Sequence, residues 1–204
     1  MFDSHMVPVV AITDDLRDGR DGLVARALGA VRGGATMVQL RLKDADARTL
    51  VEVACALVVA MPVPVVVNDR VDVALAARAA GVHVGADDLP VDAVRRIAPP
   101  GFIVGASVGC DAEVAGARGA DYVGIGPVYA TVSKRDAGSA IGVAEFERLA
   151  RACGVPAVAI GGITPERVPP LMAAGASGVA VIRAILSAAD PEAAARAMRH
   201  ATGA

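Results

Sequence analysis

The sequence contains few aromatic residues, and this limits the kind of core that it can build. Phe, Tyr and Trp make up 2% of the 204 residues and tryptophan is absent, whereas apolar residues make up 54%. The core must therefore consist of many small side chains, mainly alanine and valine, on regular elements. This composition is typical of a valine-rich parallel sheet covered by alanine-rich helices.

Cysteine is also scarce, which argues against a disulfide framework and against structural zinc. The three cysteines, Cys55, Cys110 and Cys153, show no paired spacing. Cys55 falls in an apolar helical run and is expected in the core. An odd, scattered set favours a reducing compartment, and we expect a cytoplasmic protein.

The chain lacks a long apolar run, a signal peptide and a strong net charge. Its longest charge-free apolar run in the first half, Val53–Val67, is interrupted by Pro62 and Pro64, whereas a spanning helix needs about 18–20 apolar residues. No basic region leads into an apolar stretch with a cleavage site. A net charge of −2 gives no general attraction for nucleic acid. We expect small-molecule substrates, no nucleic-acid or membrane partner, and leave a homo-oligomer open.

Lysine is rarer than arginine, and its two occurrences have similar surroundings. Lys43 and Lys134 are the two lysines among 20 Lys and Arg residues, and each follows an apolar, strand-like run. A lysine ammonium can approach a phosphate oxygen or form a Schiff base. Two lysines at two strand ends therefore indicate a site, although an arginine-rich composition could leave two lysines by chance.

Short β-branched runs alternate with longer alanine- and arginine-rich stretches along the whole chain. The predicted strands are Pro8–Thr13, Met37–Leu42, Pro64–Asn68, Val82–Gly85, Phe102–Ser107, Tyr122–Gly126, Ala157–Gly161 and Gly178–Ile182. The predicted helices are Gly22–Arg32, Ala47–Met61, Asp72–Ala80, Val91–Ile97, Asp111–Arg118, Val143–Ala152, Pro165–Ala174, Ala184–Ser187 and Pro191–Ala201.

This alternation predicts an α/β fold: a single (β/α)8 TIM barrel with a C-terminal helix. Gly-Ala pairs between helices and strands are typical of repeated βα units, and eight units in about 200 residues match the lower size range of such barrels. We expect a loose N-terminal segment at residues 1–6 and one domain at residues 7–204. An open doubly wound sheet is the alternative, disfavoured because no Gly-x-Gly-x-x-Gly follows the first strand.

Polar residues cluster at the carboxyl ends of the predicted strands, which share one rim in a barrel that carries the chemistry. They are Gln39, Arg41 and Lys43 after the second strand, Asn68 and Asp69 after the third, Asp87 and Asp88 after the fourth, Ser107 in the fifth, Thr131, Ser133 and Lys134 after the sixth, and Gly161 and Gly162 after the seventh. Alternation along the second strand predicts that its three polar side chains point the same way.

Each group has a purely structural alternative. The alternatives are helix capping for Asn68-Asp69 and for Asp87-Asp88, a solvated loop for Thr131–Lys134, and close packing for Gly161-Gly162. The histidine in the predicted core, His83, is expected to be a packed or hydrogen-bonded residue rather than a general base.

Complementary charges at the rim favour a binding site over these alternatives. Two acidic positions at neighbouring strand ends suit Mg²⁺, which is typically held by one or two carboxylates plus substrate phosphate. Arg41, Lys43 and Lys134 supply cations, and the Arg41 fork suits two phosphate oxygens. Gly161-Gly162 and the backbone at Ile182-Arg183 could form a second anion site. The rim therefore predicts a Mg²⁺-diphosphate subsite opposite a monophosphate subsite.

The motifs at these positions resemble the thiamine-phosphate synthase family over essentially the whole chain. They are Gln39–Lys43 (QLRLK), Asn68–Ala74 (NDRVDVA), Gly81–Leu89 (GVHVGADDL), Gly126–Tyr129 with Ser133–Asp136, Ile160–Ile163 (IGGI) and Gly178–Ile182 (GVAVI). The resemblance implies that a pyrimidine diphosphate and a thiazole phosphate are joined, with Mg²⁺, to give thiamine phosphate and diphosphate. It also implies a dissociative reaction, in which diphosphate leaves before the thiazole nitrogen attacks.

The resemblance further implies a role for each site residue. Residues Gln39, Arg41, Lys43, Asn68, Ser107 and Lys134 would bind the pyrimidine diphosphate. The thiazole phosphate would be bound by Thr131, Ser133, Gly162 and the backbone at Ile182 and Arg183. Leu40, Leu42 and Val132 would be further substrate-binding residues, and Asp69 and Asp88 would bind Mg²⁺. Among these, Arg41, Lys43, Ser107 and Lys134 would be catalytic. The chain departs from the family pattern at Ala86, Gly109, Cys110, Ala130 and Arg183, which affects substrate placement more than the fold.

Three other functions remain as alternatives. The paralogous thiazole tautomerase is expected to use a histidine shortly after the strand-five serine, where this chain has Gly109. A class I aldolase-like lyase would use Lys134 as a Schiff-base lysine, but that lysine follows a long polar loop, whereas the chemistry requires a desolvated amine. A non-catalytic phosphate-ligand-binding barrel would bind without turnover.

Overall fold

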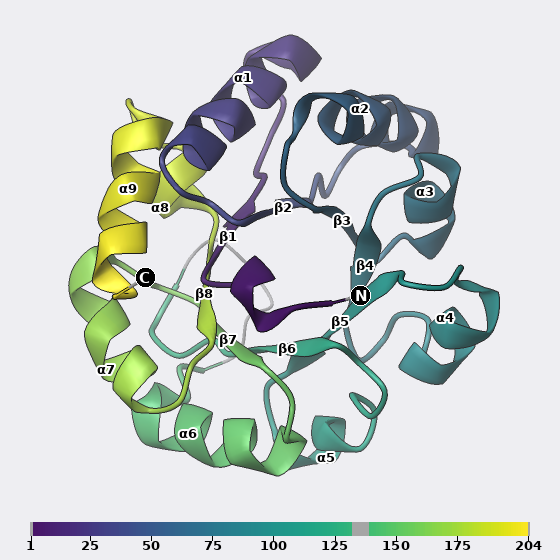
Figure 1. The fold of residues 1–204 in the computed structure, drawn as a ribbon. Coiled ribbons are helices and arrows are strands. Elements are labelled where there is room, and N and C mark those ends of the chain that lie inside the picture. Colours follow the sequence, from purple (N-terminus) through teal and green to yellow (C-terminus); the bar gives the residue numbers. More distant parts are fainter. Residues whose placement is uncertain (1, 132–138, 204) are drawn as a thin grey trace.

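The computed structural model describes residues 2–131 and 139–203. Eight parallel strands pair in sequence order, and the last pairs with the first to close a barrel (Figure 1). The strands are β1 (Val9–Ile12), β2 (Met37–Leu40), β3 (Val65–Asn68), β4 (Gly81–Val84), β5 (Ile103–Val108), β6 (Tyr122–Ile125), β7 (Ala157–Ile160) and β8 (Gly178–Val181). The predicted (β/α)8 barrel is confirmed, and the open sheet is wrong.

Helices surround the barrel and connect successive strands (Figure 1). The α-helices are α1 (Gly19–Arg32), α2 (Ala47–Ala60), α3 (Val71–Ala76), α4 (Val91–Ile97), α5 (Asp111–Val114), α6 (Gly142–Cys153), α7 (Val168–Ala173), α8 (Arg183–Leu186) and α9 (Pro191–Ala201), and the 3-10 helices are η1 (Ser4–Met6) and η2 (Pro165–Arg167). The predicted C-terminal helix is confirmed as α9.

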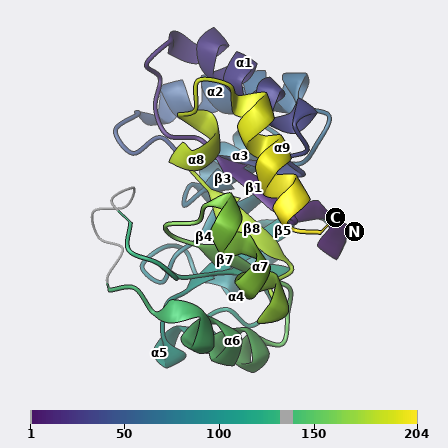
Figure 2. The ribbon, with the colours of Figure 1, turned by 90° about the vertical axis from the view of Figure 1, so that its left-hand side faces the viewer.

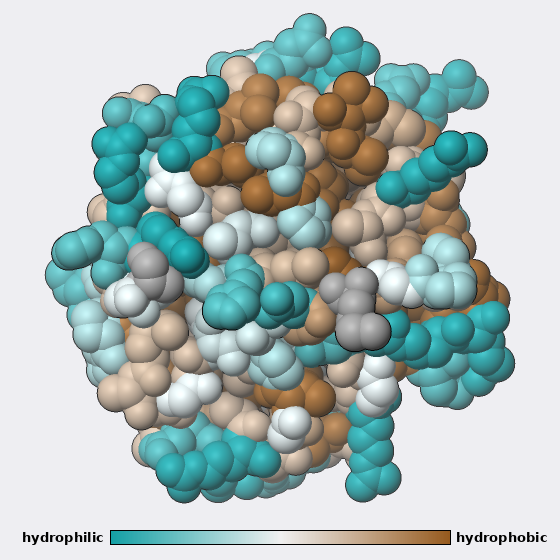
Figure 3. Space-filling view, in the orientation of Figure 1, coloured by the Kyte–Doolittle hydropathy of each residue, from teal (hydrophilic) through white to brown (hydrophobic). Residues whose placement is uncertain are grey.

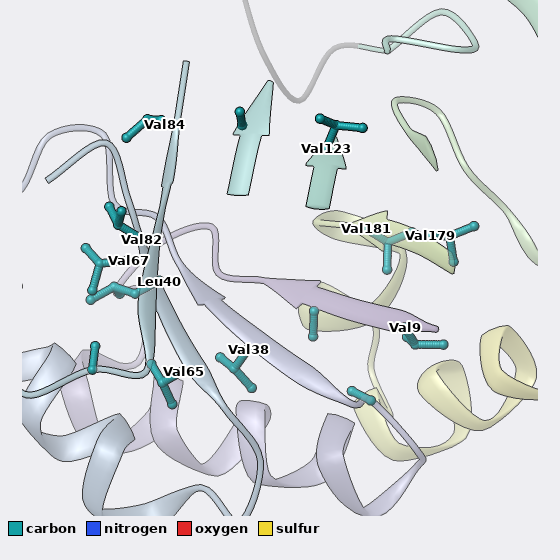
Figure 4. Packing of buried hydrophobic residues seen from close by; sticks show 14 of the residues in the cluster. Val9, Val38, Leu40, Val65, Val67, Val82, Val84, Val123, Val179 and Val181 are labelled. Carbon is teal, nitrogen blue, oxygen red and sulfur yellow. The ribbon is translucent and has the colours of Figure 1, made fainter. Parts of the chain in front are cut away.

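Alternation along each strand divides the apolar residues between two cores. Val38, Val67, Val82 and Val179 belong to the large cluster between the strands and the helices (Figure 4). The residues of opposite parity fill the inside of the barrel in a second, smaller cluster. These inner residues are Val10, Ile12, Met37, Val66, Ile103, Tyr122, Val158 and Ala180.

The N-terminal end of the barrel is covered by the start of the chain. Residues Ser4–Met6 form η1, and the Asp3 side chain accepts a hydrogen bond from the His5 N–H. The Phe2 ring stacks on the buried Tyr122 ring, with 5.9 Å between centroids. The segment expected to be loose therefore contains a short 3-10 helix and packs on the barrel interior through this apolar contact. Both chain ends lie at this end of the barrel (Figure 2).

The surface around the N-terminal turn is mixed in polarity. On the face around the N-terminal turn, hydrophilic residues gather along the edge and apolar residues form patches between them (Figure 3). Cys55 is exposed rather than in the core, because the buried face of α2 is formed by Leu50, Val53, Ala54 and Leu57. In the described part of the chain, no helix is long and apolar enough to cross a membrane.

Several elements are shorter than predicted. The second strand ends at Leu40 rather than Leu42, and the fifth helix ends at Val114 rather than Arg118. The predicted helix at Pro165–Ala174 is divided into η2 and α7. Two consecutive prolines near the start of α7 explain this division, since proline lacks an N–H and fits only the first turn of an α-helix.

Candidate active site

The predicted site residues that the structure describes belong to different strands or the loops after them, and they share the carboxyl end of the barrel because all eight strands are parallel. A direct contact joins two of them: Gln39 Nε2 donates to Asn68 Oδ1 at 2.7 Å, linking the end of β2 to the end of β3. Gln39 is 5% exposed, so this hydrogen bond satisfies a buried amide and fixes the direction in which Asn68 points.

The segment after β2 is divided between the site and the core. The side chains of Leu40 and Leu42 are buried in the outer cluster, between the strands and the helices. Arg41 is half-buried and Lys43 is exposed. The strand ends at Leu40, so Arg41 and Lys43 lie in the following loop. Of the three polar residues Gln39, Arg41 and Lys43, only Gln39 has a side-chain direction set by the alternation along the strand.

The backbone of Arg41 is held by a residue that the sequence analysis missed. The fully buried Thr13 hydroxyl accepts from the Arg41 N–H at 2.8 Å and donates to the Arg41 carbonyl at 3.0 Å. The Thr13 N–H also donates to the Gln39 carbonyl at 2.9 Å. Thr13 thus extends the pairing of β1 and β2 by side-chain contacts. The sequence contained one indication of this role: Thr13 is a polar residue directly after the apolar strand Val9–Ile12.

Asp69 has an uncommon backbone conformation. Its φ is 63°, one of two positive values at non-glycine positions in the described residues. Its N–H donates to the His83 carbonyl at 2.8 Å, which ties the turn after β3 to β4. The residue capping α3 is Arg70, with no side-chain capping bond, so the capping alternative for Asn68-Asp69 is wrong. A left-handed aspartate held by a neighbouring strand is typical of functional sites.

Asp88 closes the turn after β4. Its Oδ2 accepts from the Gly85 N–H at 2.7 Å, and its own N–H donates to the Gly85 carbonyl at 3.3 Å. The N-cap of α4 is Pro90, with no side-chain capping bond, so the capping alternative for Asp87-Asp88 is wrong too. The two Gly85–Asp88 bonds close this turn without using the side chain of Ala86, the position that departs from the family pattern.

Ser107 is half-buried near the end of β5 and is bound by His83. The His83 Nε2 lies 3.0 Å from Ser107 Oγ, and the Nδ1 lies 3.1 Å from the Tyr122 hydroxyl. The expectation that His83 is a hydrogen-bonded core residue is confirmed, since it is 8% exposed. The contribution of Tyr122 was missed; this residue is one of only two tyrosines in the chain.

The loop after β7 packs closely on the start of the β6–α6 connection. Gly161 and Gly162 have φ values of 99° and 64°, and a Cβ at Gly162 would lie 2.6 Å from the Ala130 carbonyl oxygen. Arg167 Nη1 donates to the Gly162 carbonyl at 2.6 Å, and its guanidinium lies 4.6 Å from the Tyr129 ring centroid. Close packing is therefore one reason for these glycines.

The remaining predicted site residues follow β6 and β8. Thr131 is half-buried beside this packed region. Val132, Ser133 and Lys134 lie outside the described residues. At β8, Ile182 is the N-cap of α8 and Arg183 is its first, exposed residue, so this pair forms the junction between strand and helix.

The described residues contain no cluster of three or more His, Cys, Asp or Glu side chains that could hold a metal ion. The two carboxylates assigned to Mg²⁺ in the sequence analysis, Asp69 and Asp88, follow the adjacent strands β3 and β4. Hard oxygen donors of this number suit Mg²⁺ that is completed by substrate phosphate, and do not suit zinc.

A sequence profile for thiamine monophosphate synthase matches residues 9–185. The chain belongs to the thiamine monophosphate synthase family. The resemblance found in the motifs is thereby confirmed.

Individual relatives of this family match almost the whole chain. A thiamine-phosphate synthase of Roseiflexus castenholzii is 48% identical over 202 residues, covering 97% of this chain and 89% of the relative. That of Methanoculleus marisnigri is 50% identical over 175 residues, covering 83% of each.

A solved thiamine phosphate pyrophosphorylase from Pyrococcus furiosus has a TM-score of 0.86 at 34% identity, covering 98% of this chain and 97% of that one. A 3-hexulose-6-phosphate synthase, with a TM-score of 0.74 at 20% identity, shares the barrel fold alone.

Proposed function

We propose that this protein joins 4-amino-2-methyl-5-(diphosphooxymethyl)pyrimidine to 4-methyl-5-(2-phosphoethyl)thiazole, releasing diphosphate and forming thiamine phosphate. Membership of the thiamine monophosphate synthase family supports this. The observation that carries it is the rim itself, where cationic, amide and carboxylate side chains follow β2, β3 and β4. The Gln39 amide is bound to Asn68 across the strands, and the turns that carry Asp69 and Asp88 are bound to β4 and to Gly85.

The pyrimidine diphosphate would bind beside β2, β3 and β5. Arg41, with its backbone bound by Thr13, and Lys43 would contact the diphosphate, together with Lys134. The Gln39 amide donates to the Asn68 oxygen, so the Asn68 amide N–H groups would be the ones to donate to the ligand. Ser107 would supply a hydroxyl. A guanidinium fork and ammonium groups suit the charge of a diphosphate.

Asp69 and Asp88 would hold Mg²⁺, a donor set that fits the hard oxygen ligands described above. When bound, Mg²⁺ would neutralise charge that develops on the departing diphosphate. The backbone of each carboxylate is secured by its own bond to β4 or the turn after it, so both can meet the ion without reorganising the loop.

The thiazole phosphate would bind across the rim, at Thr131, Val132, Ser133, Gly162 and the Ile182-Arg183 junction. The loop at Gly162 is closed by Arg167 and Tyr129. The backbone groups of these loops suit a monophosphate, as the loops after strands seven and eight do in other barrels.

The reaction needs no general base. The methylene C–O bond breaks and its electron pair leaves with the diphosphate, and the lone pair of the thiazole nitrogen then forms the C–N bond. Arg41, Lys43 and Lys134 would stabilise the leaving group, and the barrel rim would hold the cation facing the nitrogen. His83 is buried behind Ser107 and is hydrogen-bonded to it.

The thiazole tautomerase is disfavoured by Gly109, which has no side chain to move a proton. Its backbone N–H donates to Glu113 Oε2 at 2.5 Å. The aldolase alternative depends on Lys134, and we expect borohydride with a carbonyl substrate to leave no adduct on this lysine. We further propose a cytoplasmic protein, supported by three free cysteines, and leave a homo-oligomer open.

We expect the pure protein to convert the two substrates to thiamine phosphate with Mg²⁺, and to lose this activity with EDTA. Liquid chromatography of the product, with a matched assay in which excess Mg²⁺ is restored, measures both. Absence of product in the presence of Mg²⁺ would contradict the proposed reaction and leave a binding barrel as the better description.

Thr13→Val is expected to raise the KM for the pyrimidine diphosphate about tenfold, because the two backbone groups of Arg41 lose a partner worth about 1–3 kcal/mol when buried. Thr13→Ser keeps the hydroxyl and serves as the control. Steady-state kinetics with each substrate varied in turn would show the effect on the diphosphate alone. An unchanged KM in Thr13→Val would refute the role given to this threonine.

A further inference from the structure

Three polar side chains form a chain of hydrogen bonds inside the barrel and below the proposed site. Tyr122 in β6 is 1% exposed and contacts His83 Nδ1, and His83 Nε2 contacts Ser107 Oγ at the rim. Strands β4, β5 and β6 are neighbours, and His83 and Tyr122 lie on either side of Gly105 in the pairing register. The chain of bonds therefore runs from the middle of the barrel to the rim.

Two glycines make room for this arrangement. A Cβ at Gly105 would lie 2.3 Å from Tyr122 Cζ and 2.5 Å from His83 Nδ1, at the point where the two side chains meet. A Cβ at Gly124 would lie 3.1 Å from His83 Cε1. The next two strands, β5 and β6, thus carry no side chain at the two positions beside the imidazole, and this leaves room for the ring to reach both partners.

The direction of these hydrogen bonds follows from the burial of Tyr122. Burial raises the pKa of this phenol far above its usual value, so it stays protonated. Within the described part of the chain, the hydrogen-bond partner of the Tyr122 hydroxyl is His83 Nδ1. If the phenol accepted from Nδ1–H, its own O–H would be buried without an acceptor, at a cost of about 1–3 kcal/mol. The phenol therefore donates and Nδ1 accepts.

We propose that His83 is a positioning residue, held by Tyr122 in the neutral Nε2–H tautomer, which donates to Ser107 Oγ and thereby directs the serine's own proton to the substrate. A serine hydroxyl has one proton and two lone pairs. With one lone pair engaged by Nε2–H, the Ser107 O–H is left to donate to an acceptor at the rim, such as an oxygen of the pyrimidine diphosphate. This role rests on the proposed function, because it needs Ser107 to touch substrate.

The N-terminal turn contributes from the other end of the barrel. The Phe2 ring stacks on Tyr122 at an interplanar angle of 16°. This contact covers the tyrosine with an apolar ring and helps to keep water from its hydroxyl. A water molecule there would compete with His83 Nδ1 for the Tyr122 O–H, and the His83 ring would no longer be held in one tautomer.

A spectroscopic test addresses the hydrogen-bond direction without any turnover. We expect ¹H–¹⁵N correlation spectra of the histidine rings to show the His83 proton on Nε2 in the wild-type protein, with His83→Gln used to assign the signals. Tyr122→Phe removes only the hydroxyl and should yield a mixture of tautomers. A proton on Nδ1 in the wild type, or a ring protonated on both nitrogens, would overturn the proposal.

Kinetics test whether His83 acts through Ser107. His83→Met should lower kcat about tenfold, the value of about one hydrogen bond, whereas His83→Gln, of similar length and able to donate to Ser107, should recover most of the rate. Combined with Ser107→Ala, the His83→Met change should have no further effect, because the two residues act as one unit. Additive losses, or equal losses in the Met and Gln variants, would indicate a merely structural histidine.

The two tests separate the two proposals. If the wild-type protein makes no thiamine phosphate but shows the Nε2–H tautomer, the proposed function fails and the hydrogen-bond direction stands. If turnover is normal and the tautomer is Nδ1–H, the reaction stands and the positioning role fails.

Discussion

Asp88→Asn is expected to lower kcat/KM at least about 100-fold, because a carboxylate that holds Mg²⁺ contributes several kcal/mol to stabilising the leaving group. Asparagine keeps an oxygen that can accept from the Gly85 N–H, so the turn after β4 stays closed. The substitution therefore removes a charge with little change in shape. Activity measured across a Mg²⁺ titration should show the half-maximal concentration shifted upward as well.

The adjacent residue offers a matched control. Asp87 is exposed in the same turn, and Asp87→Asn removes the same charge from the same region. We expect it to leave kcat/KM within about twofold, since exposed charges interact weakly through water. Equal losses in the two variants would mean that the turn needs overall negative charge. Wild-type activity and Mg²⁺ dependence in Asp88→Asn would remove Asp88 from the site.

Gly178→Ala is expected to reduce the free energy of unfolding by about 3 kcal/mol or more. Gly178 begins β8, the strand that closes the barrel against β1. A Cβ there would lie 1.9 Å from the Val7 carbonyl oxygen and 2.7 Å from Pro8 Cα. Both are backbone atoms, so no side-chain rotation can relieve the overlap and the chain entering β1 must shift.

Gly29→Ala is the matched control for this substitution. Gly29 lies inside α1, and a Cβ there would meet its nearest neighbours, Arg32 Nη2 and Pro191 Cβ, at the ordinary distances of 3.6 and 3.7 Å. We expect it to stabilise the protein by about 0.5–1 kcal/mol, because alanine loses less backbone entropy in a helix. Urea unfolding followed by far-UV circular dichroism measures both. Equal stability of Gly178→Ala and the wild type would contradict the close approach at β8.

The sequence predicted the fold better than the lengths of its elements. Valine-rich runs and Gly-Ala helix exits identified all eight strands. Each strand is buried on both faces, by the helices outside and by the barrel interior inside, so its sequence is almost continuously apolar. The second strand was predicted two residues too long, since Arg41 and Leu42 continue the alternation after pairing stops. Strand pairing depends on the neighbouring chain, which local pattern does not report.

The candidate site shows the same limit. Asp69 and Asp88 were predicted as metal ligands from residue type and place in the chain, with helix capping as the structural alternative. Only the structure shows that the caps are Arg70 and Pro90 and that the two aspartates contact His83 and Gly85. Thr13 and Tyr122 were missed, because each acts on a residue far away in sequence, Arg41 and His83.

What the sequence determined by itself is the order of the elements, the parity of each strand and the chemical character of the rim. Alternation alone places Gln39, Asn68, His83 and Ser107 on the inward side of their strands. Their polar side chains, together with the cations and carboxylates in the loops after the strands, favour binding of phosphate groups.

The tertiary structure decided which inward residues meet. Closure of the barrel sets a register that places His83 beside Gly105 and Tyr122 across it. From that register come the Gln39–Asn68 bond, the Thr13–Arg41 bonds and the chain from Tyr122 to Ser107. Contacts between strands depend on the stagger at which a sheet closes, a property of the whole barrel that no single strand contains.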